Sequence, residues 1–222
     1  MNKRPPILIE MKRSIRKRCG YGCIICGASI YTYHHINGFR DEVGHIESEI
    51  TLLCDSCHRK TTNGIIPLAE IMRADADPIN RQPSTPHSRP EKIWYSRDLI
   101  CEARVGSNRA WVGFQPQRGC NILVLDGHVV LGMEVEGDHW LLNLEVRDPC
   151  QCLLQIRRNE LIYRIAEVDD IEYQGGTVTI RLGGKVHFRM KLHPPVCEIT
   201  EAIFYWNGIL VAIHNGDFVL FQ

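Results

Sequence analysis

The chain has 222 residues, enough for a small module followed by a domain of ordinary size. Hydrophobic residues make up 44% of it and charged residues 23%, a balance that excludes global disorder and indicates a protein with a buried core. Lys plus Arg number 26 and Asp plus Glu number 26, so the net charge indicates neither an acidic nor a basic partner. Any electrostatic argument must therefore be local.

No part of the sequence approaches the roughly 18 consecutive apolar residues typical of a membrane-spanning helix. The first charged residues are not followed by an apolar stretch of the signal-peptide type. We therefore expect a cytoplasmic protein that has no contact with membranes. In that reducing compartment the 10 cysteines are expected to be metal ligands or buried thiols rather than members of a disulfide framework.

A basic segment extends from Met1 to Arg18, where the positive charges are opposed only by Glu10. Such a run attracts phosphate, although a solvated, partly helical tail would have the same composition. Its basic residues are Lys3, Arg4, Lys12, Arg13, Arg16, Lys17 and Arg18. Of these, we take Arg13, Arg16, Lys17 and Arg18 as the candidates for contact with nucleic acid.

Composition divides the chain into three parts. Close Cys and His clusters occupy the first part, which ends in a short helix opened by proline over Pro67–Ala74. The prolines among Asn, Gln, Ser and Arg that follow resist regular structure and are typical of an interdomain linker. We therefore expect a module over residues 1–76, a linker over 77–92 and a second domain over 93–222.

The second domain shows the two-residue periodicity of strands that are half buried in a sheet. Apolar side chains alternate with polar ones at Trp140, Leu142, Leu144 and Val146, and again at Val186, Phe188, Met190 and Leu192. Turn dipeptides that accept positive φ punctuate these runs at 175–176, 183–184, 207–208 and 215–216. The pattern predicts an all-β domain of antiparallel hairpins, either a sandwich or a rolled sheet, and hence an α+β chain.

Two CxxC pairs, Cys23-Ile-Ile-Cys26 and Cys54-Asp-Ser-Cys57, stand out in the first part. Two such knuckles can close a tetrahedral thiolate site around zinc. Buried free cysteines or a redox CxxC would leave the presence of two pairs unexplained. We therefore predict a structural Zn²⁺ held by the four cysteines.

Histidines accompany these knuckles. Tyr33-His34-His35-Ile36 lies between the two pairs, and His58 follows the second pair directly. Because four thiolates already fill a tetrahedral site, the histidines remain available for a second metal or for proton transfer. Adjacent histidines at a strand end and a third at a helix start would form a compact site for phosphodiester hydrolysis.

The order of these motifs resembles that of the HNH endonucleases with cysteine knuckles, whose pattern runs CxxC, then two adjacent residues ending in His, then LCxxCH. Here the pattern is carried by the first CxxC, by His34-His35 and by Leu53-Cys54-Asp55-Ser56-Cys57-His58. The resemblance implies a ββα-metal fold, with two strands and a helix around one divalent cation and zinc knuckles holding the ends. It also implies DNA as the substrate.

Carried over to this chain, the resemblance implies that His35 is the general base and that His34 and His58 ligate a catalytic Mg²⁺ or Mn²⁺. An imidazole suits the first role because its pKa lies near neutrality. The implied products carry 5′-phosphate and 3′-hydroxyl ends. Arg40 and Arg59, close to these histidines in the sequence, are further candidates for phosphate contact, with solvated surface charges as the alternative.

The chain departs from the family at the position of its middle Asn, which is Glu49 here. We expect the Glu49 carboxylate to orient His35 by a hydrogen bond and so to take part in catalysis. Asn37 is another candidate by identity, but Asn37-Gly38 is more typical of a turn. His45 either supports the site or belongs to the intervening loop, and the loop is favoured.

These observations predict a metal-dependent HNH DNA endonuclease of bacterial defence or mobile-element type. The β domain would then select the target, sense a trigger or form a homo-oligomer. A catalytically silent zinc module that binds DNA or protein is the alternative. A third interpretation makes the β domain the principal binding module and the zinc unit an accessory. The presence of the outer histidines favours catalysis.

Overall fold

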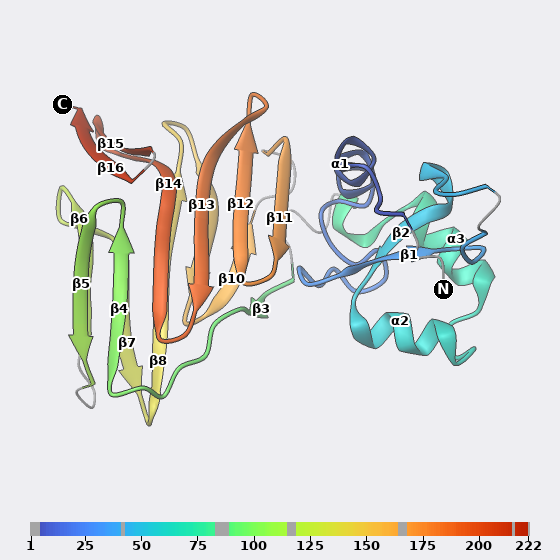
Figure 1. Ribbon diagram of the computed structural model, residues 1–222, viewed down its shortest axis with the longest axis horizontal. Coiled ribbons are helices and arrows are strands. Elements are labelled where there is room, and N and C mark those ends of the chain that lie inside the picture. The colour runs from blue at the N-terminus through green and yellow to red at the C-terminus, as the bar shows by residue number, and fades with distance from the viewer. Residues whose placement is uncertain are drawn as a thin grey trace. The chain divides into compact units, whose positions relative to one another are not determined.

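A computed structural model describes residues 5–40, 43–82, 89–114, 119–163, 168–214 and 216–221. The chain divides into two compact units, Met1–Arg89 and Pro90–Gln222 (Figure 1). Within the described ranges, no helix has the length and apolar character needed to cross a membrane.

The first unit contains a two-stranded antiparallel sheet of β1 (Thr32–His35) and β2 (Ile50–Leu53). The helices in its described part are α1 (Ile9–Arg18), α2 (Asp55–Thr62) and α3 (Leu68–Ala76), with single 3-10 turns at η1 (Glu47–Glu49) and η2 (Ile79–Arg81). Because α2 begins two residues after β2 ends, the chain passes directly from strand to strand to helix. The helix predicted after Pro67 is confirmed as α3, with Pro67 at its N-cap.

The core of the first unit is small. All four side chains of β2 are buried, and both α1 and α2 contact this strand. Apolar side chains such as Ile15 of α1 and Ile71 of α3 complete the core, together with Ile24 from the first knuckle. A module of this size buries little apolar surface, which is the situation in which a structural metal contributes most to folding.

The segment predicted as a linker, residues 77–92, contains residues that pack in each of the two units. Asn80 is buried at 1% exposure, and its Nδ2 donates to the Gly20 carbonyl oxygen at 3.2 Å. Farther on, β3 (Glu91–Lys92) pairs with a strand of the second unit. Proline restricts the backbone locally but does not prevent a segment from packing. Pro83 and Pro86 lie outside the described residues.

The described strands of the second unit form a six-stranded and an eight-stranded sheet. The first has the order β3, β10 (Glu160–Tyr163), β9 (Cys152–Arg157), β8 (His139–Arg147), β7 (His128–Glu136), β6 (Cys120–Leu125). The second has the order β11 (Asp170–Gln174), β12 (Thr177–Leu182), β13 (Lys185–His193), β14 (Val196–Trp206), β15 (Ile209–His214), β16 (Asp217–Phe221), with β4 (Ile100–Val105) beside β14 and β5 (Asn108–Gly113) beside β4.

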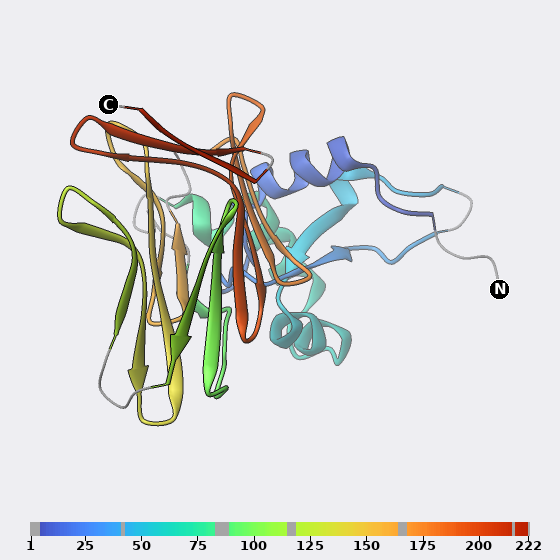
Figure 2. The same ribbon diagram turned by 60° about the vertical axis from the view of Figure 1, so that its left-hand side comes forward.

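The two sheets lie as two layers that contact each other at β8 and β14 (Figure 2). The predicted inward residues are buried from Trp140 to Val146 in β8 and from Phe188 to Leu192 in β13, although Leu141, which was predicted to face the other way, is buried as well. The prediction of a purely antiparallel domain is wrong, because β4 runs parallel to β14. Hairpin turns are local features that can be predicted from the sequence. The pairing of strands that are distant in the sequence depends on the tertiary fold and cannot be predicted in this way.

The predicted turns are also confirmed where they are described. Gly175-Gly176, Gly183-Gly184 and Asn207-Gly208 all adopt positive φ between paired strands. Asn215, the first residue of the remaining predicted turn, lies outside the described residues.

Candidate metal centre

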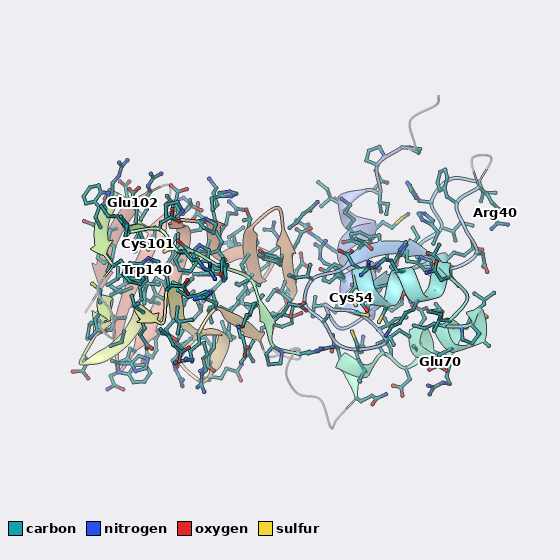
Figure 3. All side chains as sticks on the ribbon, turned by 90° about the horizontal axis from the view of Figure 1, so that it is seen from below. Arg40, Cys54, Glu70, Cys101, Glu102 and Trp140 are labelled. Atoms are coloured by element: carbon teal, nitrogen blue, oxygen red, sulfur yellow. The ribbon has the colours of Figure 1, made fainter. Side chains whose placement is uncertain are left out.

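The four cysteines of the two knuckles converge on one point of the first unit. The sulfur atoms of Cys23, Cys26, Cys54 and Cys57 all lie within 4.8 Å of one another, and Cys54 is seen among them in Figure 3. The Sγ atoms of Cys26 and Cys54 are 3.6 Å apart. Thiolates that bind zinc tetrahedrally at about 2.3 Å are about 3.8 Å from one another. The donor set and its spacing therefore fit a structural zinc ion.

Backbone hydrogen bonds shape both knuckles. In the first, the Gly27 amide donates to the Cys23 carbonyl oxygen at 2.8 Å, and the Cys23 amide donates to the Ala28 carbonyl oxygen at 2.9 Å. This turn needs glycine, since Gly27 has a φ of +77°. In the second, Cys54 is the N-cap of α2, and the Cys57 amide donates to its Sγ at 3.5 Å. An amide and a helix N-terminus thus direct partial positive charge at the sulfur of Cys54.

The thiols shift one another's pKa. A hydrogen bond from the Cys23 thiol lowers the pKa of Cys26 and raises that of Cys23, which burial raises further. Burial and the negative charge of Cys26 raise the pKa of Cys57. Without a cation, the cluster thus resists carrying four negative charges together. Metal binding would release protons from these thiols.

Beside this cluster, the rings of His34 and His58 approach each other. His34 lies in β1 and His58 in α2, and their ring centroids are 4.9 Å apart with an interplanar angle of 85°. Burial lowers the pKa of His34, and the charges of His58 and His35 lower it further. These effects favour the neutral form of His34, which is the form that binds metals.

His35 occupies a different environment. Consecutive strand residues direct their side chains to opposite faces, so His35 is expected to point away from His34. Its Nε2 lies 2.9 Å from Nδ1 of His45, and the two rings are stacked with an interplanar angle of 29°. Phe39 contacts both rings. His45 is thus a partner of His35, the candidate base. The sequence had favoured only a loop role for His45.

Glu49 also has a neighbour that the sequence did not predict. Both of its carboxylate oxygens accept from Nη2 of Arg40, at 3.0 and 2.9 Å. The backbone of Glu49, rather than its side chain, contacts the end of the first strand: the Ile36 amide donates to the Glu49 carbonyl oxygen at 2.8 Å. The ion pair also offsets the charge of Arg40, which lies at the end of the unit away from Cys54 (Figure 3).

The candidate nucleic-acid contacts of the basic segment fall into two kinds. Arg16 is 2% exposed, and its Nη1 donates to the Tyr33 hydroxyl at 2.7 Å. Arg18 forms an ion pair with Asp75. These two side chains are therefore engaged inside the first unit, and burial excludes Arg16 from contact with a phosphate in this conformation.

Other predicted contacts lie on the surface. Arg13, Lys17 and Arg59 are exposed. Lys3 and Arg4 lie outside the described residues. Phosphate contact thus stays a prediction for the exposed side chains.

Comparison with known proteins identifies no relative: no family model, no curated protein and no solved structure matches this chain. The resemblance to HNH endonucleases therefore rests on the sequence motifs.

Proposed function

We propose that the first unit is a metal-dependent DNA endonuclease module of the HNH type, stabilised by a structural zinc ion. The observation that carries this proposal is the approach of His34 and His58, from the first strand and the helix, to a centroid separation of 4.9 Å. Two imidazoles that share a cation at about 2.1 Å have centroids roughly 5 Å apart. The separation is thus compatible with a shared divalent ion.

The local topology gives a second line of support. The motif resemblance implies two strands followed by a helix, and β1, β2 and α2 follow one another in that order. The paired histidines lie at the end of β1, and the last knuckle cysteine immediately precedes His58 on α2. The zinc site links the first knuckle to this helix, so it would hold the histidine-bearing elements in place.

Each histidine then has a defined role. His34 and His58 would hold Mg²⁺ or Mn²⁺. When bound, the cation polarises the scissile phosphate and stabilises charge on the leaving 3′ oxygen. His35 accepts a proton from the attacking water as its oxygen bonds to phosphorus. The bond between phosphorus and the 3′ oxygen breaks and the 3′ oxygen takes a proton from solvent water, which leaves a 5′-phosphate and a 3′-hydroxyl.

The exposed basic residues supply the electrostatic part of DNA binding. Arg13 and Lys17 lie on α1 and Arg59 lies next to His58. Contacts of this kind are made with phosphates, carry no sequence information and weaken as the salt concentration rises.

Plasmid cleavage by the full-length, zinc-loaded protein tests the proposal. We expect cleavage only with an added divalent cation, and a rate about 10²- to 10⁴-fold lower in a His35→Ala variant. His193→Ala is the matched control, because His193 is an exposed histidine of the second unit, and it should cleave at the parental rate. Undiminished cleavage by His35→Ala would refute the assigned base.

The exposed basic residues also support a second candidate, a zinc module that binds DNA without cleaving it. The same experiment separates the two, since this alternative predicts DNA binding by the zinc-loaded protein and no cleavage with either Mg²⁺ or Mn²⁺.

A further inference from the structure

We infer that His45 is a positioning residue, which fixes the tautomer and the orientation of the His35 ring. The catalytic consequence of this inference rests on the proposed nuclease function, whereas the tautomer does not. The two rings belong to a chain of hydrogen bonds that ends on the backbone: His35 Nε2 lies 2.9 Å from His45 Nδ1, and His45 Nε2 lies 2.8 Å from the Pro5 carbonyl oxygen.

The carbonyl oxygen determines where the protons are. It can only accept a hydrogen bond, so Nε2 of His45 must carry a hydrogen. A neutral imidazole has a single N–H, which makes Nδ1 of His45 the acceptor. The hydrogen between the two rings therefore belongs to Nε2 of His35. In the neutral His35 ring the basic lone pair is consequently on Nδ1.

The surroundings hold this arrangement in place. Phe39 packs against both rings, with its ring centroid 5.3 Å from that of His35 and 5.1 Å from that of His45. His35 and His45 are both partly buried. A hydrogen bond in such partly apolar surroundings is stronger than one in water, so it restrains rotation of the His35 ring.

A fixed tautomer matters for a general base. The ring accepts a proton only at the nitrogen that has the lone pair, and that nitrogen must face the attacking water. Glu49, the residue that the sequence suggested for this orienting role, instead has both carboxylate oxygens bound by Arg40. The geometry therefore assigns the orienting role to His45.

Two substitutions separate the hydrogen bond from the packing of the ring. In His45→Asn the amide oxygen branches from the same carbon as Nδ1 did, so an acceptor for His35 is retained. In His45→Phe the ring and its contact with Phe39 are retained, but no acceptor is present. Zinc content, measured on both full-length variants, verifies that the first unit is folded.

Nitrogen NMR of histidine-labelled protein tests the tautomer without any cleavage assay. Spectra are recorded at about pH 8, where an ordinary imidazole is neutral, and His35→Gln identifies the His35 signals. We expect the parental protein and His45→Asn to show a protonated Nε2 and an unprotonated Nδ1 on His35. In His45→Phe the two nitrogen shifts should move toward each other, because both tautomers become populated. Unchanged shifts in His45→Phe would overturn the inference.

Cleavage kinetics test the catalytic consequence. We expect kcat of His45→Phe to fall by about 10²-fold with little change in KM, since misplacement of a catalytic group has this cost. His45→Asn should keep kcat within about tenfold of the parental value. A loss of kcat in His45→Asn as large as that in His45→Phe, or a loss in His45→Asn alone, would show that the acceptor is not what positions His35 and would overturn the catalytic consequence. If the parental protein cleaves no DNA while the NMR result is as expected, the proposed function fails and the tautomer assignment stands.

Discussion

His34 and His58 come from different elements, a strand and a helix, yet their ring centroids are only 4.9 Å apart. The two cysteine knuckles explain this proximity. Cys54 is the N-cap of the helix that carries His58, and its Sγ lies 3.6 Å from that of Cys26, in the knuckle that precedes the first strand. A metal bound by these thiols would therefore join the two histidine-bearing segments as well as stabilise the core.

The zinc site yields the first prediction. The purified protein should contain about one tightly bound zinc per chain, and Cys54→Ser should unfold the first unit, since metal binding of about 10–16 kcal/mol in small zinc modules is coupled to folding. Elemental analysis measures the metal. Cys150→Ser, at an exposed cysteine of the second unit, is the control and should keep the zinc.

The second unit should stay folded in the Cys54→Ser variant. All 4 tryptophans of the chain lie beyond residue 90, so tryptophan fluorescence reports on the second unit alone. We expect the same fluorescence unfolding transition in Cys54→Ser as in the parental protein. Protein that lacks zinc when purified without chelator, or a simultaneous loss of both units in the variant, would count against the assignment.

The second prediction concerns the catalytic cation. His58→Ala removes one of its two proposed protein ligands, so the Mg²⁺ concentration that gives half-maximal cleavage should rise by at least about tenfold. His34→Ala should behave in the same way. Cleavage rates across a series of Mg²⁺ and Mn²⁺ concentrations measure the effect. An unaltered metal response in both variants would place the cation elsewhere.

Features set by local spacing were readily predicted from the sequence. The first CxxC pair lies in a tight turn and the second at the start of α2, and the presence of two such pairs predicts the sulfur cluster. Alternating apolar residues and glycine turns likewise revealed the hairpins of the second unit.

Features set by the tertiary fold could not be predicted from the sequence. Nothing in the spacing of His45 relates it to His35, because the contact depends on how the chain folds back between the strands. The burial of Arg16 has a similar cause, since its partner Tyr33 lies on a different element. From the sequence alone, a basic residue in a basic segment is expected to be exposed. Its burial can be predicted only when the helix face that packs on the core is known.

The basic segment supplies the third prediction, which contrasts two arginines of one helix. Arg16→Ala should destabilise the first unit by about 1–3 kcal/mol, because the change removes a part-buried hydrogen bond from a charged donor to the Tyr33 hydroxyl. Arg13→Ala, at an exposed position, should cost less stability than Arg16→Ala and should weaken DNA binding. Chemical unfolding followed by helix circular dichroism and a DNA-binding titration measure the two effects. Equal stability in both variants would contradict the buried role of Arg16.

The fourth prediction concerns the ion pair of Arg40 and Glu49. Glu49→Gln removes the carboxylate charge that offsets Arg40, so DNA binding should become a few-fold tighter and more sensitive to salt. Arg40→Ala should have the opposite effect, and in an Arg40→Ala background Glu49→Gln should change little. The rate of cleavage at saturating DNA should stay close to the parental rate. A loss as large as that of His35→Ala would instead restore Glu49 as the group that orients the base.

The last prediction concerns His187 in β13 of the second unit. Burial lowers the pKa of this histidine, and the nearby charge of Asp148, which raises it, is the smaller effect. The folded state therefore disfavours the protonated ring, while the unfolded chain keeps a histidine pKa near 6.5. As the pH falls through that value toward the lower folded pKa, the unfolded state binds more protons and the stability of the second unit decreases.

His187→Gln removes the titrating ring while keeping a polar side chain. We expect urea unfolding of this variant, followed by tryptophan fluorescence, to lose less stability between about pH 7.5 and pH 5.5 than the parental protein does. The matched control is His193→Gln, whose side chain lies at the exposed end of the same strand and should keep the parental pH dependence. If His187→Gln and the parental protein lose stability equally over this range, the pH dependence of the second unit arises from other groups.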